Sequence, residues 1–184
     1  MHHRFNLWEE QAIIRMPGCH LEDHFFVLQN ILNYDYLWIR LRVKGGAYGC
    51  MSGFGRDGDC YMVSYLDPKL AETNEVYDKL PEYLEQFDQD ERSMDRYVIG
   101  AISEMEHSEN PAALGVRGLT AYLSGIIREQ LQKERDEVID TDAKEIRALV
   151  PYAKAVLSNN CLCVVGNENK IKENSSLFTT VRSL

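Results

Sequence analysis

Apolar and polar residues repeat along this chain with two periods, one helical and one extended. Over residues 24–38, apolar side chains recur at spacings of three and four, which predicts a helix buried on a wide face. Two strand-like runs follow at residues 47–54 and 59–66, and the segment Gly55-Arg56-Asp57-Gly58 between them is typical of a hairpin turn. This part of the chain therefore predicts a helix followed by a β-hairpin.

The remainder is mostly helical in pattern, while residues 1–19 show no clear period. Helices are expected at residues 70–80, 90–105 and 143–159, with a helical region at 110–135 and a last short helix at 170–178. The apolar run at residues 161–165 is typical of a strand. Because strands and helices are segregated along the chain, the pattern predicts an α+β fold whose antiparallel sheet is covered by helices on one face.

Composition narrows the function classes. The 184 residues carry a formal charge of −9, which argues against a nucleic-acid partner because such binding needs a broad basic face. No apolar run approaches the roughly 18–20 residues of a membrane helix, and the start has no apolar signal core, so neither membrane insertion nor export is expected. An odd set of five cysteines favours reduced thiols in the cytoplasm, and Cys161 and Cys163 are expected to be buried in the core.

The run His20-Leu21-Glu22-Asp23-His24 has the spacing of a zinc site. Histidines four residues apart lie on one helical face and can bind zinc together, and peptidases of the inverted type use H-x-x-E-H. Here the fourth position is Asp23, whose shorter side chain falls back by roughly 1.5 Å, about one C–C bond. The spacing nominates no third ligand. The favoured interpretation is an exposed helix start at which the acidic residues suit the helix dipole.

A basic ladder runs into a glycine pair and a tyrosine. The ladder consists of Arg40, Arg42 and Lys44, and it is followed by Gly45-Gly46 and Tyr48. The sequence G-x-x-x-x-G-K-[ST] of a phosphate loop is absent from this segment. One interpretation is a solvated basic edge. The other is a bend that brings an arginine and a tyrosine together as hydrogen-bond donors to a carbonyl or an oxyanion.

Several short motifs, in order along residues 25–184, resemble the presequence-protease branch of the pitrilysin/insulinase class of zinc metallopeptidases. They are Leu32-Asn33-Tyr34-Asp35-Tyr36-Leu37-Trp38, Arg42-Val43-Lys44-Gly45-Gly46-Ala47-Tyr48-Gly49, Ser64-Tyr65-Leu66-Asp67-Pro68, Ile99-Gly100, Gln132-Lys133-Glu134-Arg135 and Cys163-Val164-Val165-Gly166-Asn167-Glu168. The resemblance implies the last α/β domain of a two-halved protease. It also implies a division into a poorly matched segment, residues 1–24, and the peptidase-family domain, residues 25–184.

By this resemblance, Arg42 holds a substrate carbonyl and Tyr48 supports the oxyanion, with Gly45 and Gly46 as further substrate-binding positions. The six-residue separation of Arg42 and Tyr48 would place both on one side of a strand. The family usually has arginine where Leu66 stands, so a contact is lost there. No zinc motif matches within this chain, and zinc is expected in the N-terminal half of the full enzyme.

Three hypotheses follow for function. The first is the C-terminal, substrate-binding part of a zinc metalloendopeptidase that degrades unstructured peptides and is inactive without its zinc-bearing half. The second is a non-catalytic peptide-binding or scaffold domain, with a second copy of the chain as a partner. The third is a self-contained metalloenzyme that uses His20 and His24.

Overall fold

A four-stranded antiparallel sheet organises the part of the protein that the structure describes. The computed structural model describes residues 7–13, 24–55, 58–106 and 108–182. The strands lie in the order β2-β3-β1-β4. Their bounds are β1 Leu7–Ile13, β2 Gly49–Phe54, β3 Asp59–Tyr65 and β4 Leu162–Val165. Strands β2 and β3 form the expected hairpin, with Gly49 opposite Tyr65 and Phe54 opposite Cys60.

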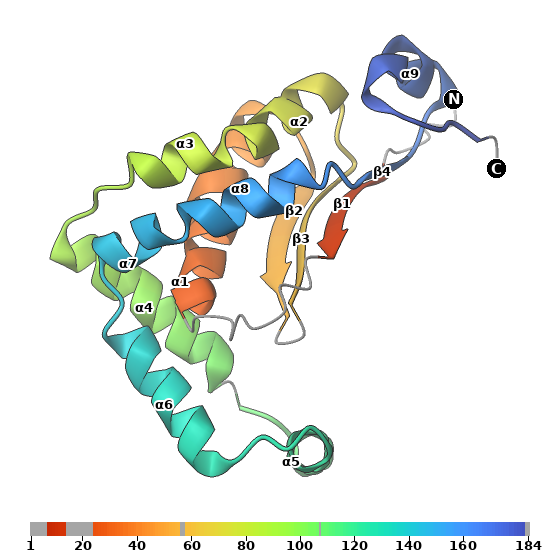
Figure 1. Ribbon diagram of the computed structural model, residues 1–184. Helices are drawn as coiled ribbons and strands as arrows, with labels where there is room; N and C mark the ends of the chain where they lie inside the picture. The colour runs from red at the N-terminus through yellow and green to blue at the C-terminus, as the bar shows by residue number, and fades with distance from the viewer. Residues whose placement is uncertain (1–6, 14–23, 56–57, 107, 183–184) are drawn as a thin grey trace.

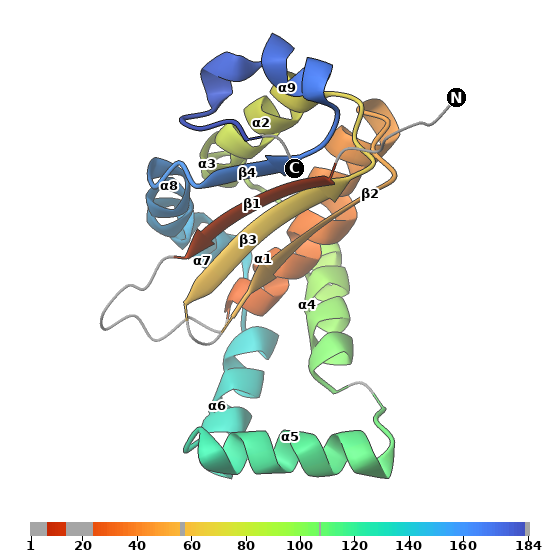
Figure 2. The ribbon, with the colours of Figure 1, turned by 90° about the vertical axis from the view of Figure 1, so that its right-hand side faces the viewer.

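Helices α1, α3, α7 and α8 form a layer that covers one face of this sheet. This layer leaves the other face open (Figures 1 and 2). This arrangement confirms the expected α+β class. The helices are α1 His24–Ile31, α2 Leu70–Asp78, α3 Leu80–Glu85, α4 Glu91–Met105, α5 Pro111–Leu123, α6 Arg128–Ile139, α7 Ala143–Ala148, α8 Val150–Ser158 and α9 Glu168–Glu173. A short 3₁₀ turn, η3, spans Ser175–Leu177. Within the described ranges, no helix is long and apolar enough to cross a membrane.

The first helix continues past its expected end at residue 38. After α1, two π-helical stretches, η1 Leu32–Tyr36 and η2 Trp38–Lys44, carry the helical path on to Lys44. Leu37 and Leu41 are almost fully buried and hold these turns against the core. Wide π-turns inside a helix are uncommon and occur frequently at functional sites. The extension places Arg40, Arg42 and Lys44 on a helix.

The core fills the space between the covered sheet face and the helices. Alternate residues of the hairpin point inward, and Met62 is 5% exposed while its outward-pointing neighbour Tyr61 is 37% exposed. The ring of Phe25 packs on Phe54 at 5.0 Å and meets Tyr152 edge-on at 5.6 Å. One aromatic group therefore joins α1, β2 and α8.

A side chain occupies the outer edge of β2. The Asn33 amide donates to the Ser52 carbonyl at 3.2 Å, and the Ser52 backbone N–H donates to Asn33 Oδ1 at 2.5 Å. The Ser52 hydroxyl donates to the same oxygen at 2.9 Å. The amide group thus makes the pair of bonds that a neighbouring strand would make, and it fixes β2 to η1.

Three further stretches differ from what the sequence pattern indicated. Residues 7–13 form a strand, and it pairs with β3 on one side and β4 on the other. The helix expected over residues 143–159 is two helices, because α8 restarts after Leu149 with a proline in its first turn. The helix region expected at 110–135 likewise breaks at Gly125, whose φ is +69°.

The expectation of buried thiols near the C-terminus was also wrong. Cys161 and Cys163 are both exposed free cysteines. Strand β4 lies at an edge of the sheet, and its partly covered positions are Leu162 and Val164. An edge strand has a neighbouring strand on one side only, so a run of apolar residues does not ensure burial there.

Candidate functional site

Arg42 and Tyr48 come together at the point where the first helix turns into the sheet. Arg42 belongs to the last turn of η2, and Tyr48 directly precedes β2. The Arg42 guanidinium carbon lies 5.9 Å from the centre of the Tyr48 ring. Both side chains are exposed, and Tyr48 retains 62% of its accessible surface. The structure therefore brings together the two residues that the sequence singled out.

They meet by a different route from the one expected. The prediction that both lie on one side of a strand was wrong, because Arg42 is helical and the chain reverses between residues 45 and 48. Gly46 has a φ of +88°, a backbone conformation that L-residues with side chains rarely adopt. At Gly45 a Cβ would collide with the carbonyl of Leu41. The glycine pair thus makes the reversal, and its role in the structure is to shape the backbone.

Two further aromatic residues complete what we call the clamp cluster, formed by Trp38, Arg42, Tyr48 and Tyr65. The Arg42 guanidinium lies over the Trp38 ring, 4.1 Å from its centre. On the other side, the rings of Tyr48 and Tyr65 are 5.7 Å apart. A cation over the face of an aromatic ring is attracted to it, so the Trp38 ring favours this position of the Arg42 guanidinium. The spacing of four between Trp38 and Arg42 on a helix is the sequence signal that could have identified the tryptophan.

A buried carboxylate holds the strand end beneath this cluster. Asp67 accepts hydrogen bonds from the Ser64 hydroxyl at 2.8 Å, the Thr73 hydroxyl at 2.7 Å and the Lys69 backbone N–H at 2.9 Å. Between Tyr65 and Asp67, Leu66 has a φ of +52°, in the left-handed region. The Asp67 bonds join the start of α2 to the end of β3, and they thereby hold the backbone of β3 in place at Tyr65.

Burial next to the clamp cluster also lowers the reactivity of the Cys50 thiol. Cys50 is 9% exposed, and burial raises the pKa of its thiol to about 11, although the Arg42 charge acts in the opposite direction. At neutral pH this thiol stays protonated, so it is a poor nucleophile.

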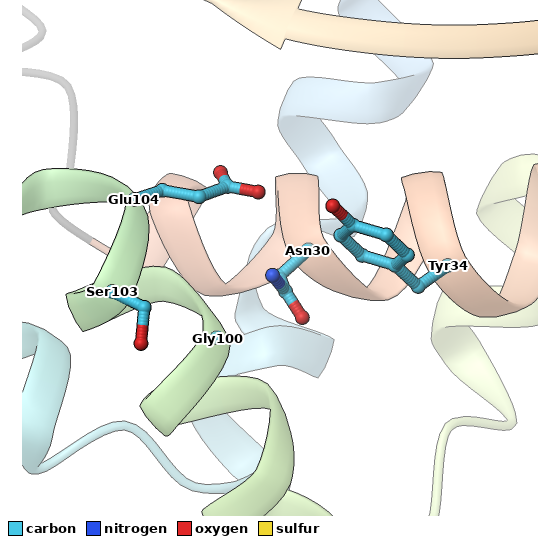
Figure 3. A pocket seen from close by; sticks show the side chains of 5 residues that line it. All are labelled: Asn30, Tyr34, Gly100, Ser103 and Glu104. Carbon is cyan, nitrogen blue, oxygen red and sulfur yellow. The ribbon is translucent and has the colours of Figure 1, made fainter. Parts of the chain in front are cut away.

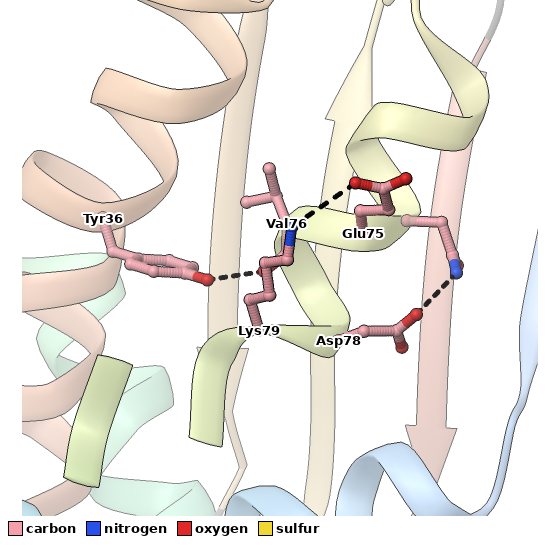
Figure 4. Close-up of polar contacts among 6 residues, drawn as sticks. Tyr36, Glu75, Val76, Asp78 and Lys79 are labelled. Carbon is pink, nitrogen blue, oxygen red and sulfur yellow. Dashed lines mark hydrogen bonds and ion pairs between the residues drawn. The ribbon is translucent and has the colours of Figure 1, made fainter. Parts of the chain in front are cut away.

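The neighbouring cation of the ladder has a different environment. The Arg40 guanidinium lies over the Tyr36 ring at 4.1 Å and near the Tyr83 ring at 5.2 Å. Tyr36 is 1% exposed, and its hydroxyl donates to the Val76 carbonyl at 2.6 Å (Figure 4). Burial raises the pKa of Tyr36 to about 12. We call Tyr36, Arg40 and Tyr83 the anchor cluster, because it joins the first helix to α2 and α3.

The metal-site hypothesis has little support from the described residues. His20 and Asp23 lie outside them, whereas the ring nitrogen Nδ1 of His24 is 2.8 Å from the Thr141 hydroxyl. Among the described residues, no group of three His, Cys, Asp or Glu side chains could hold a metal ion. The described residues therefore do not fit a zinc centre.

A separate open pocket lies between the first helix and α4 (Figure 3). Its volume is about 510 Å³, and its lining consists of Asn30, Tyr34, Gly100, Ser103 and Glu104. No residue of the clamp cluster lines it. The pocket is a feature of the helix layer and does not add to the site built around Arg42 and Tyr48.

Comparison with known proteins assigns a family to this fold. The family model described as the PreP C-terminal domain matches residues 4–166. The chain belongs to the PreP C-terminal domain family. The resemblance to the presequence-protease branch of the pitrilysin class is thereby confirmed. The match begins within residues 1–24, which contribute β1 to the sheet; the division at residue 24 stays a prediction.

Relatives with the same sequence features are much longer proteins. The chain is similar to Protein HypA of Clostridium perfringens, with 45% identity over 161 residues, which cover 86% of this chain and 16% of HypA. It is also similar to presequence protease 1 of Arabidopsis thaliana, chloroplastic/mitochondrial, with 28% identity over 93% of this chain and 16% of that protein. The chain therefore spans about one sixth of the length of these relatives.

A solved structure has the same fold over nearly the whole chain. The inactive peptidase domain of a putative zinc protease from Bordetella parapertussis aligns with a TM-score of 0.67 and 15% identity, covering 91% of each chain. The peptidase M16 inactive domain from Pseudomonas fluorescens aligns with a TM-score of 0.59 and 15% identity, covering 89% of this chain and 40% of that one. At these identities the similarity establishes the fold.

Proposed function

We propose that this chain is the substrate-binding C-terminal part of a zinc metalloendopeptidase that degrades unstructured peptides. Arg42 donates hydrogen bonds to a backbone carbonyl of the peptide, and the Tyr48 hydroxyl donates a hydrogen bond to the oxyanion that develops at the cleaved bond. Zinc and the general base come from the N-terminal half of the enzyme. Alone, the chain is inactive.

The observation that carries this proposal is the pairing of Arg42 with Tyr48 at an exposed surface. The two side chains are 5.9 Å apart, guanidinium to ring centre, and the glycine pair lies in the chain segment that joins them. Trp38 on one side and Tyr65 on the other restrict where both can move. Donors that are positioned in advance contribute most to catalysis, because they need no rearrangement when charge develops.

The test combines this chain with the separately expressed zinc-bearing half and measures cleavage of an unstructured peptide. We expect no cleavage by this chain alone and cleavage by the pair. Arg42→Ala or Tyr48→Phe should lower the turnover of the pair by about 10²–10³-fold, the typical effect of losing one oxyanion donor. Lys44→Ala is the matched control, since Lys44 is an exposed cation of the same helix outside the clamp cluster. Unchanged turnover in both clamp variants would show that the assignment is wrong.

The alternative function is a non-catalytic peptide-binding or scaffold domain. It predicts that the chain binds peptides or a second copy of itself and that no pairing yields cleavage. The same mixing experiment separates the two, because peptide binding without turnover in every combination supports the scaffold.

We also propose that the protein works in the cytoplasm. Cys50, Cys60, Cys161 and Cys163 are free thiols, as expected in a reducing compartment. Localisation of a fluorescent fusion tests this directly.

A further inference from the structure

Helix α5 has the apolar composition of a core helix, but its side chains are not packed in the core. Five large apolar residues on it are between 53% and 80% exposed: Leu114, Val116, Leu119, Tyr122 and Leu123. None of its thirteen residues is buried. Exposed apolar surface of this extent on one helix marks an interaction site.

The five large apolar side chains lie on one broad side of the helix. At 100° per residue, Leu114, Leu119, Tyr122, Leu123 and Val116 occupy an arc of about 200°. Arg117 is the only charged residue of α5, and it lies on the opposite side, where it forms a 3.1 Å ion pair with Glu109. The charge of the helix is therefore paired with the segment that directly precedes it, and the apolar side is left exposed.

The position of α5 in the fold suits contact with a large partner. Helices α4 and α6 extend beyond the helix layer and hold α5 past the hairpin end of the sheet (Figures 1 and 2). Strand β2 begins next to Tyr48 and ends at the hairpin, so the clamp cluster lies at the opposite end of the sheet. Only a partner large enough to cover the open side of the sheet from the clamp cluster to the hairpin would contact both the clamp cluster and α5.

We propose that the apolar side of α5 docks on the rest of the same protease, which includes the zinc-bearing half. The inference rests on the proposed function, in which that half faces Arg42 and Tyr48. The relatives are about six times as long as this chain, so the rest of such an enzyme offers ample surface to cover the helix. A second copy is the poorer occupant, because each copy carries a formal charge of −9 and like charges oppose association.

The experiment measures binding separately from catalysis. The probe is the Clostridium perfringens relative expressed without the segment that this chain matches, with its fold checked by circular dichroism; co-purification of the two co-expressed pieces provides a second readout. Leu119→Glu or Tyr122→Glu should weaken binding by at least about 30-fold, the effect of losing a central interface residue. Thr120→Glu is the matched control, since it adds the same charge to an exposed position between the apolar arc and Arg117.

The outcomes distinguish this proposal from the proposed function. Loss of binding in Leu119→Glu but not in Thr120→Glu supports docking, whether or not the pair cleaves peptides. Equal binding by both variants overturns docking, and if Arg42→Ala still lowers turnover, the proposed function stands. Failure of the unsubstituted chain to bind in both readouts overturns docking as well. So does self-association, or binding to phosphatidylglycerol vesicles, that Leu119→Glu abolishes.

Discussion

The anchor cluster and the clamp cluster place the same chemistry in two environments. In each, an arginine follows an aromatic residue by four positions, as Tyr36–Arg40 and Trp38–Arg42, with the guanidinium 4.1 Å from the ring centre. Tyr36 is 1% exposed, whereas Trp38 is 37% exposed. The pairs differ in what lies beyond the cation. Tyr83 of α3 closes over Arg40, while Arg42 is exposed and is followed by the exposed ring of Tyr48.

Position around the helix decides the role of a cation–aromatic pair in this chain. Two residues further along a helix turn the side chain by roughly half a turn, from the packed side to the opposite one. Chemistry that stabilises the fold at Arg40 is thus available to a ligand at Arg42.

The largest difference should appear when the aromatic rings are removed. Tyr36→Ala should lower the free energy of unfolding by about 3–5 kcal/mol, because it leaves a cavity between the first helix, α2 and α3. Tyr48→Ala should change it by about 0.5 kcal/mol, since that ring is mostly in water. Urea unfolding measures both. Similar losses in the two variants would show that the clamp cluster is structural.

Alkaline pH should weaken the fold through the anchor cluster. The pKa of Tyr36 is raised from 10.0 to about 12 by burial, so the folded state keeps a proton that the unfolded chain releases. This contribution is complete below pH 10 and is lost between about pH 10 and 12, at up to about 1.4 kcal/mol per pH unit. Tyr36→Phe should flatten that decline in urea midpoints. An unchanged slope would mean that Tyr36 ionises freely.

Removing each arginine should give a smaller contrast in stability. Arg40→Ala should cost about 1–2 kcal/mol, because its stem and guanidinium pack on two rings. Arg42→Ala should cost about 0.5–1 kcal/mol, as expected for an exposed cation–π pair. Thermal unfolding of both variants provides the measurement, and a larger loss for Arg42 would reverse the comparison.

The smallest effect should be the coupling between Trp38 and Arg42. A double-mutant cycle of Trp38→Leu and Arg42→Ala should give about 0.5–1 kcal/mol. In the reconstituted protease, Trp38→Leu should lower turnover, whereas the control variant Lys44→Ala should leave it unchanged. If Trp38→Leu and Arg42→Ala are fully additive in stability, the ring does not position the guanidinium.

Local patterns were sufficient for parts of this fold and not for others. The β2–β3 hairpin was predicted because its turn and both strands are contiguous in sequence. Strand β1 was missed because it is held by pairing with β3 and with β4, and β4 lies about 150 residues further along the chain. The π-turns after Ile31 were missed because apolar spacing does not record which carbonyl each N–H will reach.

In the candidate site too, the sequence identified some residues, while the way they meet depends on contacts between distant parts of the chain. Arg42 and Tyr48 were selected from sequence motifs, and the structure places them together, although their catalytic roles stay a prediction. That they meet across a helix end and a reversed segment follows from Gly45 and Gly46, whose conformations depend on what surrounds them. Tyr65 joins the cluster from the neighbouring strand, so no local spacing could have nominated it.

The Asn33 amide bound across Ser52 has a consequence for self-assembly. An exposed strand edge can recruit a strand from another molecule, and such recruitment begins with free N–H and C=O groups. At the middle of β2 both groups of Ser52 are already engaged by a side chain of the same molecule. An incoming strand must first expel that amide, so this margin of the sheet resists the growth of intermolecular β-structure.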